Sequence, residues 1–222
     1  MNVVDLSHVL AESMPVYPGT KPPRIVDSCT IRRHGFAEKL VSLYSHTGTH
    51  IDAPGHILGG GAAGLDDFAA GHFLGPGRVL DVSAVQGAPI EIAHIEEHEA
   101  ELRNVEYALL HSGWARYWGD AQYFASYPVL SAAAAAWLAG FNLKGIGVDM
   151  ISVDAPRSTA MTIHKIFFEK NMVIVENLTG LEALIGKEFV FSCLPLKWAA
   201  GDGSPVRAVA MIGEPSSGRP IS

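Results

Sequence analysis

The amino-acid sequence predicts an α/β fold. Three observations point to it: short runs rich in β-branched and aromatic residues recur along the chain, helical patterns alternate with them, and several runs are apolar throughout. Continuous apolar runs indicate strands that are buried on both faces. The expected strands are residues 3–6, 25–32, 39–45, 78–82, 107–110, 145–148, 172–175, 189–192 and 206–212.

Four segments between these strands carry helical patterns. They are residues 92–102, 131–139, 162–170 and 181–185. Gly140 is expected to end the second helix, because glycine is common just beyond a helix C-terminus. Thr179 and Glu182 stand three positions apart at the start of the fourth segment, which is the pattern of a capping box.

The composition favours a single domain, residues 1–222, that acts on a small molecule. With 222 residues, of which 48% are hydrophobic, the chain can bury a sizeable core and still extend a small arm. The net charge of -7 and the lack of a Lys/Arg cluster argue against nucleic acid or a membrane surface as partner. Neither a basic leader nor a run of about 18 apolar residues is found, so a cytoplasmic location is expected.

The two cysteines show no metal-type spacing. Cys29 and Cys193 are far apart in the sequence, and we interpret them as small core residues. The sequence leaves open a bridge between them.

Residues 46–56, HTGTHIDAPGH, carry the most informative pattern. His46, His50, Asp52 and His56 all occupy even positions, so on an extended backbone they point to the same side. The glycines and prolines of the segment make a helix the poorer interpretation. Two imidazoles and a carboxylate that converge in this way suit a first-row divalent metal, and the last imidazole is placed for proton transfer. Because chance gives this spacing in roughly one chain in a thousand, a polar turn with structural histidines is the weaker alternative.

Further ligands are expected from the second half of the chain. Glu176 is the strongest candidate, because it ends an apolar run and ligands in α/β sheets gather at the carboxyl ends of strands. His164 starts a segment with an apolar face, and its position alone suits a ligand and a partly buried structural imidazole equally. Asp149 and Asp154 are rival ligands, ranked lower because their close spacing is typical of a turn held by side chain to backbone hydrogen bonds.

The segment HTGTHIDAPGH resembles the signature H-x-G-T-H-x-D-A-P-x-H of the cyclase family of metal-dependent hydrolases, which includes bacterial kynurenine formamidases and isatin hydrolases. The likeness covers most of the chain, since further family segments follow in the same order at residues 5–8, 14–19, 75–81, 112–114 and 152–154. It implies the family's swivelling β/β/α fold with a mixed, barrel-like sheet.

The resemblance also implies five metal ligands: His46, His50, Asp52, His164 and Glu176. The first two histidines would bind one ion, the third would bind another, and the two carboxylates would be shared. Two zinc ions per chain are expected on this basis, with manganese as the alternative, because the donor set does not decide between them. His56 would remain free as the acid/base residue.

Tyr17 is the expected substrate-contacting residue. Formamidases of the family carry Trp at this place, and tyrosine can still stack on an aromatic substrate, although the change weakens a specific assignment to kynurenine chemistry. Pro15 and Pro18 make the segment extended and stiff, so it can reach over its own site or that of a neighbouring subunit. A homodimer or a higher homo-oligomer is therefore expected.

The expected reaction is hydrolysis of a non-peptide amide bond, as in an arylformamidase. A metal-bound water, ionised near neutral pH, would attack the carbonyl, and His56 would pass the proton to the departing amine. The nearest alternative is a hydrolase of cyclic amides, imides or lactones, similar to isatin hydrolase. A metal-binding protein without catalysis is the third, and it is disfavoured because a structural site has no need of the extra imidazole of His56.

Overall fold

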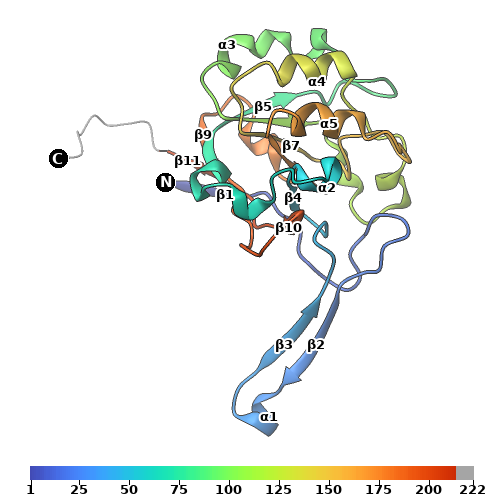
Figure 1. Ribbon diagram of the computed structural model, residues 1–222, viewed down its shortest axis with the longest axis vertical. Coiled ribbons are helices and arrows are strands. Elements are labelled where there is room, and N and C mark those ends of the chain that lie inside the picture. Colours follow the sequence, from blue (N-terminus) through green and yellow to red (C-terminus); the bar gives the residue numbers. More distant parts are fainter. Residues whose placement is uncertain (214–222) are drawn as a thin grey trace, which may run out of the picture.

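A nine-stranded mixed sheet forms the centre of the molecule, which confirms the α/β class (Figure 1). The computed structural model describes residues 1–213. The strands of the sheet are β1 (Asn2–Asp5), β4 (His50–Asp52), β5 (Leu74–Asp81), β6 (Tyr107–His111), β7 (Gly145–Val148), β8 (Val173–Glu176), β9 (Phe189–Ser192), β10 (Gly203–Pro205) and β11 (Val209–Ile212). They lie in the order β1-β11-β9-β5-β6-β7-β8-β4-β10, with β5 to β8 parallel and the flanking pairs antiparallel.

The central strands are buried on both faces, as their continuous apolar sequences predict. Every residue of β7 and β8 is buried. Along β6 the side chains alternate: Ala108 and Leu110 pack into the core beneath the helices, whereas Tyr107 and Leu109 pack into a second core on the opposite face. A Cβ atom at Gly147 of β7 would lie 2.6 Å from Leu109 Cδ2, so the second core leaves room only for glycine there.

Two helices, α4 (Ala132–Leu138) and α5 (Thr162–Phe168), pack against each other and contribute to the same core. Ser131 caps α4, because its hydroxyl accepts the backbone N–H of Ala134 at 3.2 Å. The predicted helix at 131–139 is thus confirmed within one residue at each end, and the one predicted at 162–170 ends two residues early.

The helix predicted over residues 92–102 is wrong in its continuity. The segment forms two 3₁₀ turns, Ile92–His94 and Glu96–His98, and then one turn of α-helix, α3 (Glu99–Leu102). Between the two 3₁₀ turns Ile95 has a φ of -133° and a fully buried side chain. The chain leaves helical geometry at the residue that enters the core.

The predicted capping box is also wrong. The backbone N–H of Thr179 donates to the Leu6 carbonyl at 3.0 Å. Gly180, with a φ of 70°, stands where the cap was expected, and Leu181–Leu184 is a 3₁₀ turn without a side-chain cap.

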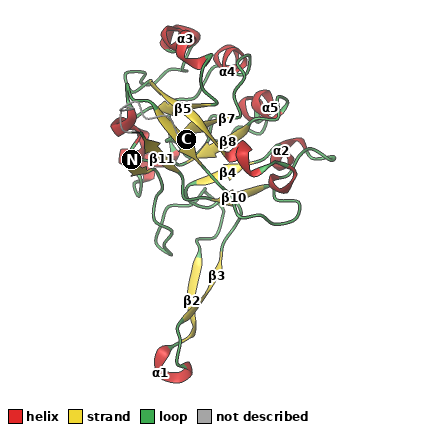
Figure 2. Cartoon of the chain, turned by 90° about the vertical axis from the view of Figure 1, so that its left-hand side faces the viewer, coloured by secondary structure: helices red, strands yellow, loops and turns green. Residues whose placement is uncertain are grey.

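Strands β2 (Arg24–Cys29) and β3 (Glu38–Ser42) form a separate hairpin that projects from the body (Figures 1 and 2). We call residues 24–42 the arm. Its tip carries α1 (Ile31–His34), a single turn ended by Gly35 with a φ of 79°, so the strand predicted over 25–32 stops early. Cys29 lies partly exposed on the arm and Cys193 is buried in the body; both are free thiols, and a core position for Cys29 is wrong.

At one end of the sheet lie β4 and, at the edge, β10. The sequence predicted these two strands less completely than the central ones. β4 belongs to the predicted extended segment, and Pro54 and Gly55 then lead into a short helix, α2 (Gly55–Leu58). β10 was not predicted, and it is short and contains Pro205, which suits only a strand at a sheet edge. No helix in the part of the chain that the structure describes is long and apolar enough to cross a membrane.

Candidate metal centre

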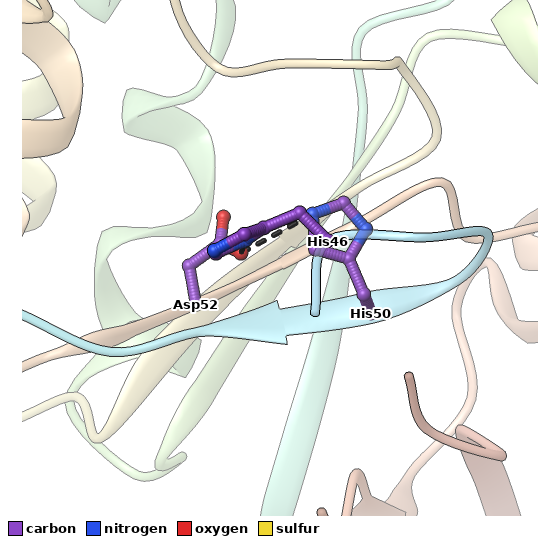
Figure 3. A group of neighbouring side chains, drawn as sticks. All are labelled: His46, His50 and Asp52. Carbon is purple, nitrogen blue, oxygen red and sulfur yellow. Dashed lines mark hydrogen bonds and ion pairs between the residues drawn. The ribbon is translucent and has the colours of Figure 1, made fainter. Parts of the chain in front are cut away.

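β4 and the bend before it carry three of the candidate ligands (Figure 3). His50 and Asp52 are two residues apart on the strand and therefore share one face; His50 Nε2 lies 3.2 Å from Asp52 Oδ1. The bend turns at Gly48, whose φ is 68°, and a Cβ atom there would lie 2.7 Å from Leu10 Cδ2. This turn returns His46 over the same face, where its Nδ1 lies 2.5 Å from Asp52 Oδ1.

The neighbouring strand β8 and helix α5 bring in the other two candidates. Glu176 is the partner of His50 in the β4–β8 pairing, and its Oε2 lies 3.6 Å from His50 Nε2. His164 Nε2 lies 3.4 Å from Glu176 Oε1 and 3.8 Å from Asp52 Oδ2. Asp52 therefore faces His46 and His50 with Oδ1, and His164 on another element with Oδ2.

The five side chains form two overlapping groups in which the candidate ligand atoms lie within 4.8 Å of one another. One group is His46, His50 and Asp52, and the other is Asp52, His164 and Glu176. The residues on β4, β8 and α5 are almost completely buried, with exposed fractions of at most 5%. Buried carboxylates and imidazoles at such distances are typical of a site for divalent metal ions.

Each of the three imidazoles has an acceptor on the ring nitrogen that is turned away from its group. The pairs are His164 Nδ1 with Asp154 Oδ2 at 2.7 Å, His50 Nδ1 with the Gly48 carbonyl at 2.8 Å, and His46 Nε2 with Asp202 Oδ2 at 3.0 Å. A ring nitrogen that donates its proton to such an acceptor leaves the other nitrogen with a free lone pair. The residues present thus fit a divalent metal.

Without a metal, the nearby carboxylates raise the pKa of all three rings. Burial alone would lower the pKa of His46, but the charge and hydrogen bond of Asp52 outweigh it and raise the pKa to about 9. Burial is likewise outweighed at His164, where hydrogen bonds to three carboxylates, that of Asp154 foremost, raise the pKa to about 11. Metal binding near neutral pH must therefore release protons.

His56 lies beside the two groups without belonging to either. The centroid of its ring is 3.8 Å from that of His46 and 6.2 Å from that of His164. Its pKa is lowered, chiefly because burial disfavours the charged imidazole. A neutral ring at neutral pH can accept a proton, which is what a general base requires.

The ligand groups open into a cavity of about 440 Å³. Three tyrosines line it, Tyr17, Tyr44 and Tyr127, together with apolar side chains such as Ile151 and Met161. Tyr17 remains 44% exposed, whereas Tyr127 is buried and donates its hydroxyl to the Asp154 carbonyl at 2.8 Å. The cavity therefore offers flat aromatic walls next to the candidate ligands.

The rival ligands Asp149 and Asp154 belong to neither group. Asp154 accepts the backbone N–H groups of Ile163 and His164 at 3.1 Å, in addition to the His164 ring, and so positions the start of α5. Asp149 accepts the N–H and the hydroxyl of Ser112 on the neighbouring strand end. The predicted side chain to backbone hydrogen bonds are present, but they reach residues 112, 114, 163 and 164 and do not hold a turn between Asp149 and Asp154.

Asp202 was missed by the sequence interpretation. It directly precedes β10, and its carboxylate lies against His46, with which it forms a third group together with His56. No spacing in the sequence signals this residue, because its partners lie about 150 positions away along the chain. Only the antiparallel pairing of β10 with β4 brings it to the site.

Comparisons with known proteins agree with this geometry. Residues 4–155 match the family model described as "Putative cyclase". The chain is 32% identical over 209 residues to the kynurenine formamidase of Bacillus cytotoxicus, covering 93% of this chain and 95% of that protein. Isatin hydrolase A from Ralstonia solanacearum superposes with a TM-score of 0.84 at 26% identity, covering 96% of this chain and 92% of its own. Isatin hydrolase A from Labrenzia aggregata, bound to benzyl benzoate, shares the fold with a TM-score of 0.84 at 24% identity, covering 96% and 94% of the two chains.

Proposed function

This protein belongs to the cyclase family, and we propose that it hydrolyses the amide bond of an N-formyl aromatic amine. It is a metal-dependent hydrolase of a non-peptide C–N bond, as its similarity to a kynurenine formamidase over nearly its whole length supports. The observation that carries the proposal is the pair of buried ligand groups with a neutral imidazole beside them. A purely structural metal site would have no use for that imidazole.

We infer that two divalent ions bind per chain, one to each ligand group, with Asp52 contributing to both. Zinc is the proposed metal and manganese the alternative, because imidazole and carboxylate donors suit both. When bound, such ions polarise a substrate carbonyl and lower the pKa of water to about 7. The protein's own contribution is to hold the donor atoms in place and to keep the site enclosed.

His56 is the proposed acid/base residue. Its ring is close to the ligand set, and its lowered pKa keeps it ready to accept a proton from the attacking water. The imidazolium formed in this way then donates that proton to the departing amine nitrogen. Residues that bind metal cannot perform this task, because their ring nitrogens are already committed.

Tyr17 is the proposed substrate contact. Its ring lines the cavity together with Tyr44 and Tyr127, and these side chains provide surfaces on which an aromatic ring can stack. An aryl group in this cavity would place its amide beside the ligand groups.

A cyclic amide is the second candidate substrate. The similarity in fold and sequence to isatin hydrolase A from Ralstonia solanacearum favours it. The same residues would act on a ring carbonyl, and the amine would remain attached to the product.

A substrate panel tests the proposed function. N-formylkynurenine, isatin, simple anilides and lactones are each assayed with Zn²⁺, with Mn²⁺ and with a chelator. We expect the highest kcat/KM for an N-formyl aromatic amine. With the chelator, we expect no hydrolysis of any substrate. Failure to hydrolyse any amide with either metal would refute the proposal, and a preference for isatin would establish the alternative.

We further propose that the protein is a homodimer or a higher homo-oligomer, held together in part by the arm. None of the residues in β2, α1 and β3 is buried. Leu40 and Val41 on β3 are 62% and 49% exposed, and Ile31 and Phe36 at the tip are exposed as well. A two-stranded ribbon is only marginally stable alone, and exposed apolar side chains mark protein interfaces.

Light scattering on the purified protein tests the role of the arm. The double variant Leu40→Ser/Val41→Ser should weaken self-association and lower the measured mass. Lys39→Ser, on the same strand, should leave the measured mass unchanged. A monomeric wild type would refute the proposed self-association.

We propose that the enzyme is located in the cytoplasm. The composition of the chain motivates this location, and the free thiols of Cys29 and Cys193 are compatible with a reducing compartment. Recovery of the native protein from an extracellular fraction would contradict it.

A further inference from the structure

Asn177, directly after Glu176 at the end of β8, has an unusual backbone for a buried residue. Its φ is 59°, in the left-handed region that side-chain-bearing residues rarely adopt. Six non-glycine residues of the described chain have positive φ, and Asn177 is the only buried one among them. Strained backbone conformations that persist inside a protein are concentrated at functional sites.

The amide side chain of Asn177 makes two short hydrogen bonds, and its Nδ2 also lies 3.3 Å from His50 Nδ1. Its Nδ2 donates to the Gly48 carbonyl at 2.8 Å, and its Oδ1 accepts the hydroxyl of Tyr123 at 2.7 Å. The reverse orientation of the amide would place Oδ1 against the Gly48 carbonyl, where two oxygens would face each other without a proton. Tyr123 is fully buried, and this burial raises the pKa of its hydroxyl far above the usual range, so the hydroxyl remains a donor.

The backbone of Asn177 is tied to the same region. Its carbonyl accepts the hydroxyl of Thr49 at 2.6 Å, and its N–H donates to the Met150 carbonyl at 2.9 Å. Side chain and backbone together therefore clamp both residues that precede His50.

The Gly48 carbonyl is the link to the metal centre. It accepts Asn177 Nδ2, and it lies 2.8 Å from His50 Nδ1. With this carbonyl fixed, the proton of His50 stays on Nδ1, and Nε2 points toward Asp52 and Glu176.

We propose that Asn177 is a positioning residue for His50: by holding the Gly48 carbonyl through its amide, it fixes the ring orientation and the tautomer that metal binding requires. The inference rests on the proposed function, because it assigns His50 as a ligand. Loss of an outer partner of this kind lowers metal affinity by about 10- to 100-fold. Tyr123 acts one step further out, since it holds the amide and not the ring.

The test uses Co²⁺ as a probe of the metal centre. Asn177→Gly keeps a residue that tolerates positive φ and removes the amide. Asn171→Gly is the matched control, because Asn171 also has a positive φ, 54°, but is exposed. Co²⁺ affinity is measured by competition with a chelator, the visible absorption of bound Co²⁺ reports ligand geometry, and circular dichroism reports folding.

We expect Asn177→Gly to fold, to bind Co²⁺ about 10- to 100-fold more weakly and to change the Co²⁺ absorption bands, whereas Asn171→Gly matches the wild type. Wild-type affinity and absorption in a folded Asn177→Gly would overturn the inference. Should that variant fail to fold, Tyr123→Phe decides: a smaller loss of affinity supports the inference, and unchanged binding overturns it. A wild-type protein that binds no Co²⁺, Zn²⁺ or Mn²⁺ would instead refute the proposed function itself.

Discussion

The metal centre and the arm distribute their side chains in opposite ways. β4, with only three residues, is completely buried and carries His50 and Asp52, whereas β3 is completely exposed and carries Leu40 and Val41. Buried charges are costly unless they are paired or bound to a metal, and exposed apolar side chains are costly unless another surface covers them. Each region therefore supports the proposal made for it: binding of cations at the centre and of a second protein surface at the arm.

The largest contrast is expected from the same substitution made in each region. Asp52→Ala should abolish both metal retention and activity, because Asp52 contacts ligands of both groups. Asp27→Ala on the arm removes only an exposed pair with Lys39, each side chain being 60% exposed, and such pairs contribute about 0–1 kcal/mol. Metal analysis and kcat/KM of the two variants measure the contrast; a metal-loaded, active Asp52→Ala would refute the assignment of the centre.

A histidine in each region gives the second comparison. His56→Ala should retain the metal and lose turnover by roughly 10²- to 10⁴-fold, as expected for a general acid/base. His34→Ala on the arm, where the ring contacts the backbone of Thr30 and the ring of Phe36, should leave turnover unchanged. If His56→Ala emptied the site, His56 would be a ligand and its proposed role would be wrong.

Competition between protons and metal ions should occur at the centre and not at the arm. The pKa of His46 is raised to about 9 and that of His164 to about 11 in the metal-free protein, so both rings are protonated at neutral pH and metal must displace these protons. Lowering the pH strengthens the competitor, and metal affinity should fall about tenfold per pH unit for each proton released. Chelator competition between about pH 6 and 8 measures the slope, which Asp27→Ala should share with the wild type. A pH-independent affinity would contradict the proposed ligands.

Metal should stabilise the body irrespective of the arm. At 100 times the Kd, each bound Zn²⁺ should raise the free energy of unfolding by about 2.7 kcal/mol, because it binds only the folded state. This increase in the free energy of unfolding should be the same in the wild type and in the Leu40→Ser/Val41→Ser variant, provided that both proteins fold. Thermal unfolding with Zn²⁺ and with chelator provides the measurement, and an increment that disappears with the arm substitutions would show that the two regions are coupled.

The smallest effect is expected at Tyr17, which belongs to neither region. Tyr17→Ala and Tyr17→Trp should leave metal content unchanged and alter the ratio of kcat/KM for N-formylkynurenine and a small anilide by about 2- to 10-fold, the range of an aromatic contact. Tyr17→Trp should favour the larger substrate. Equal ratios in the wild type and both variants would remove Tyr17 from the substrate site.

The centre was largely predictable from the sequence because its first residues are local. The spacing of His50 and Asp52 follows from side-chain alternation on a strand, and Glu176 follows from its place at a strand end. Asp202 and Asn177 could not be found in this way, because the strand pairings and turns that bring them to the site span large parts of the chain. His50 and Asp52 lie where the alternation rule places them. For His46 and His56 the predicted extended backbone is wrong, because His46 reaches the site through the bend at Gly48 and His56 lies in α2.

The arm was less predictable from the sequence than the metal centre. Its strands were predicted, but Ile31 and Arg32 were assigned to the first of them, and they form the turn of α1 instead. Residues without buried neighbours give no periodic signal to mark where a strand ends. Local sequence patterns also could not predict that the hairpin projects from the body.

The shortness of β4 has a consequence for how the centre tolerates insertions and deletions. Because β4 pairs antiparallel with β8 on one side and β10 on the other, its position along both neighbours is set by only three residues. A shift of the strand by a single residue would turn His50 and Asp52 together to the opposite face of the sheet. His50 and Asp52 therefore enter or leave the site together. An insertion or deletion just before His50 would remove both ligands or neither.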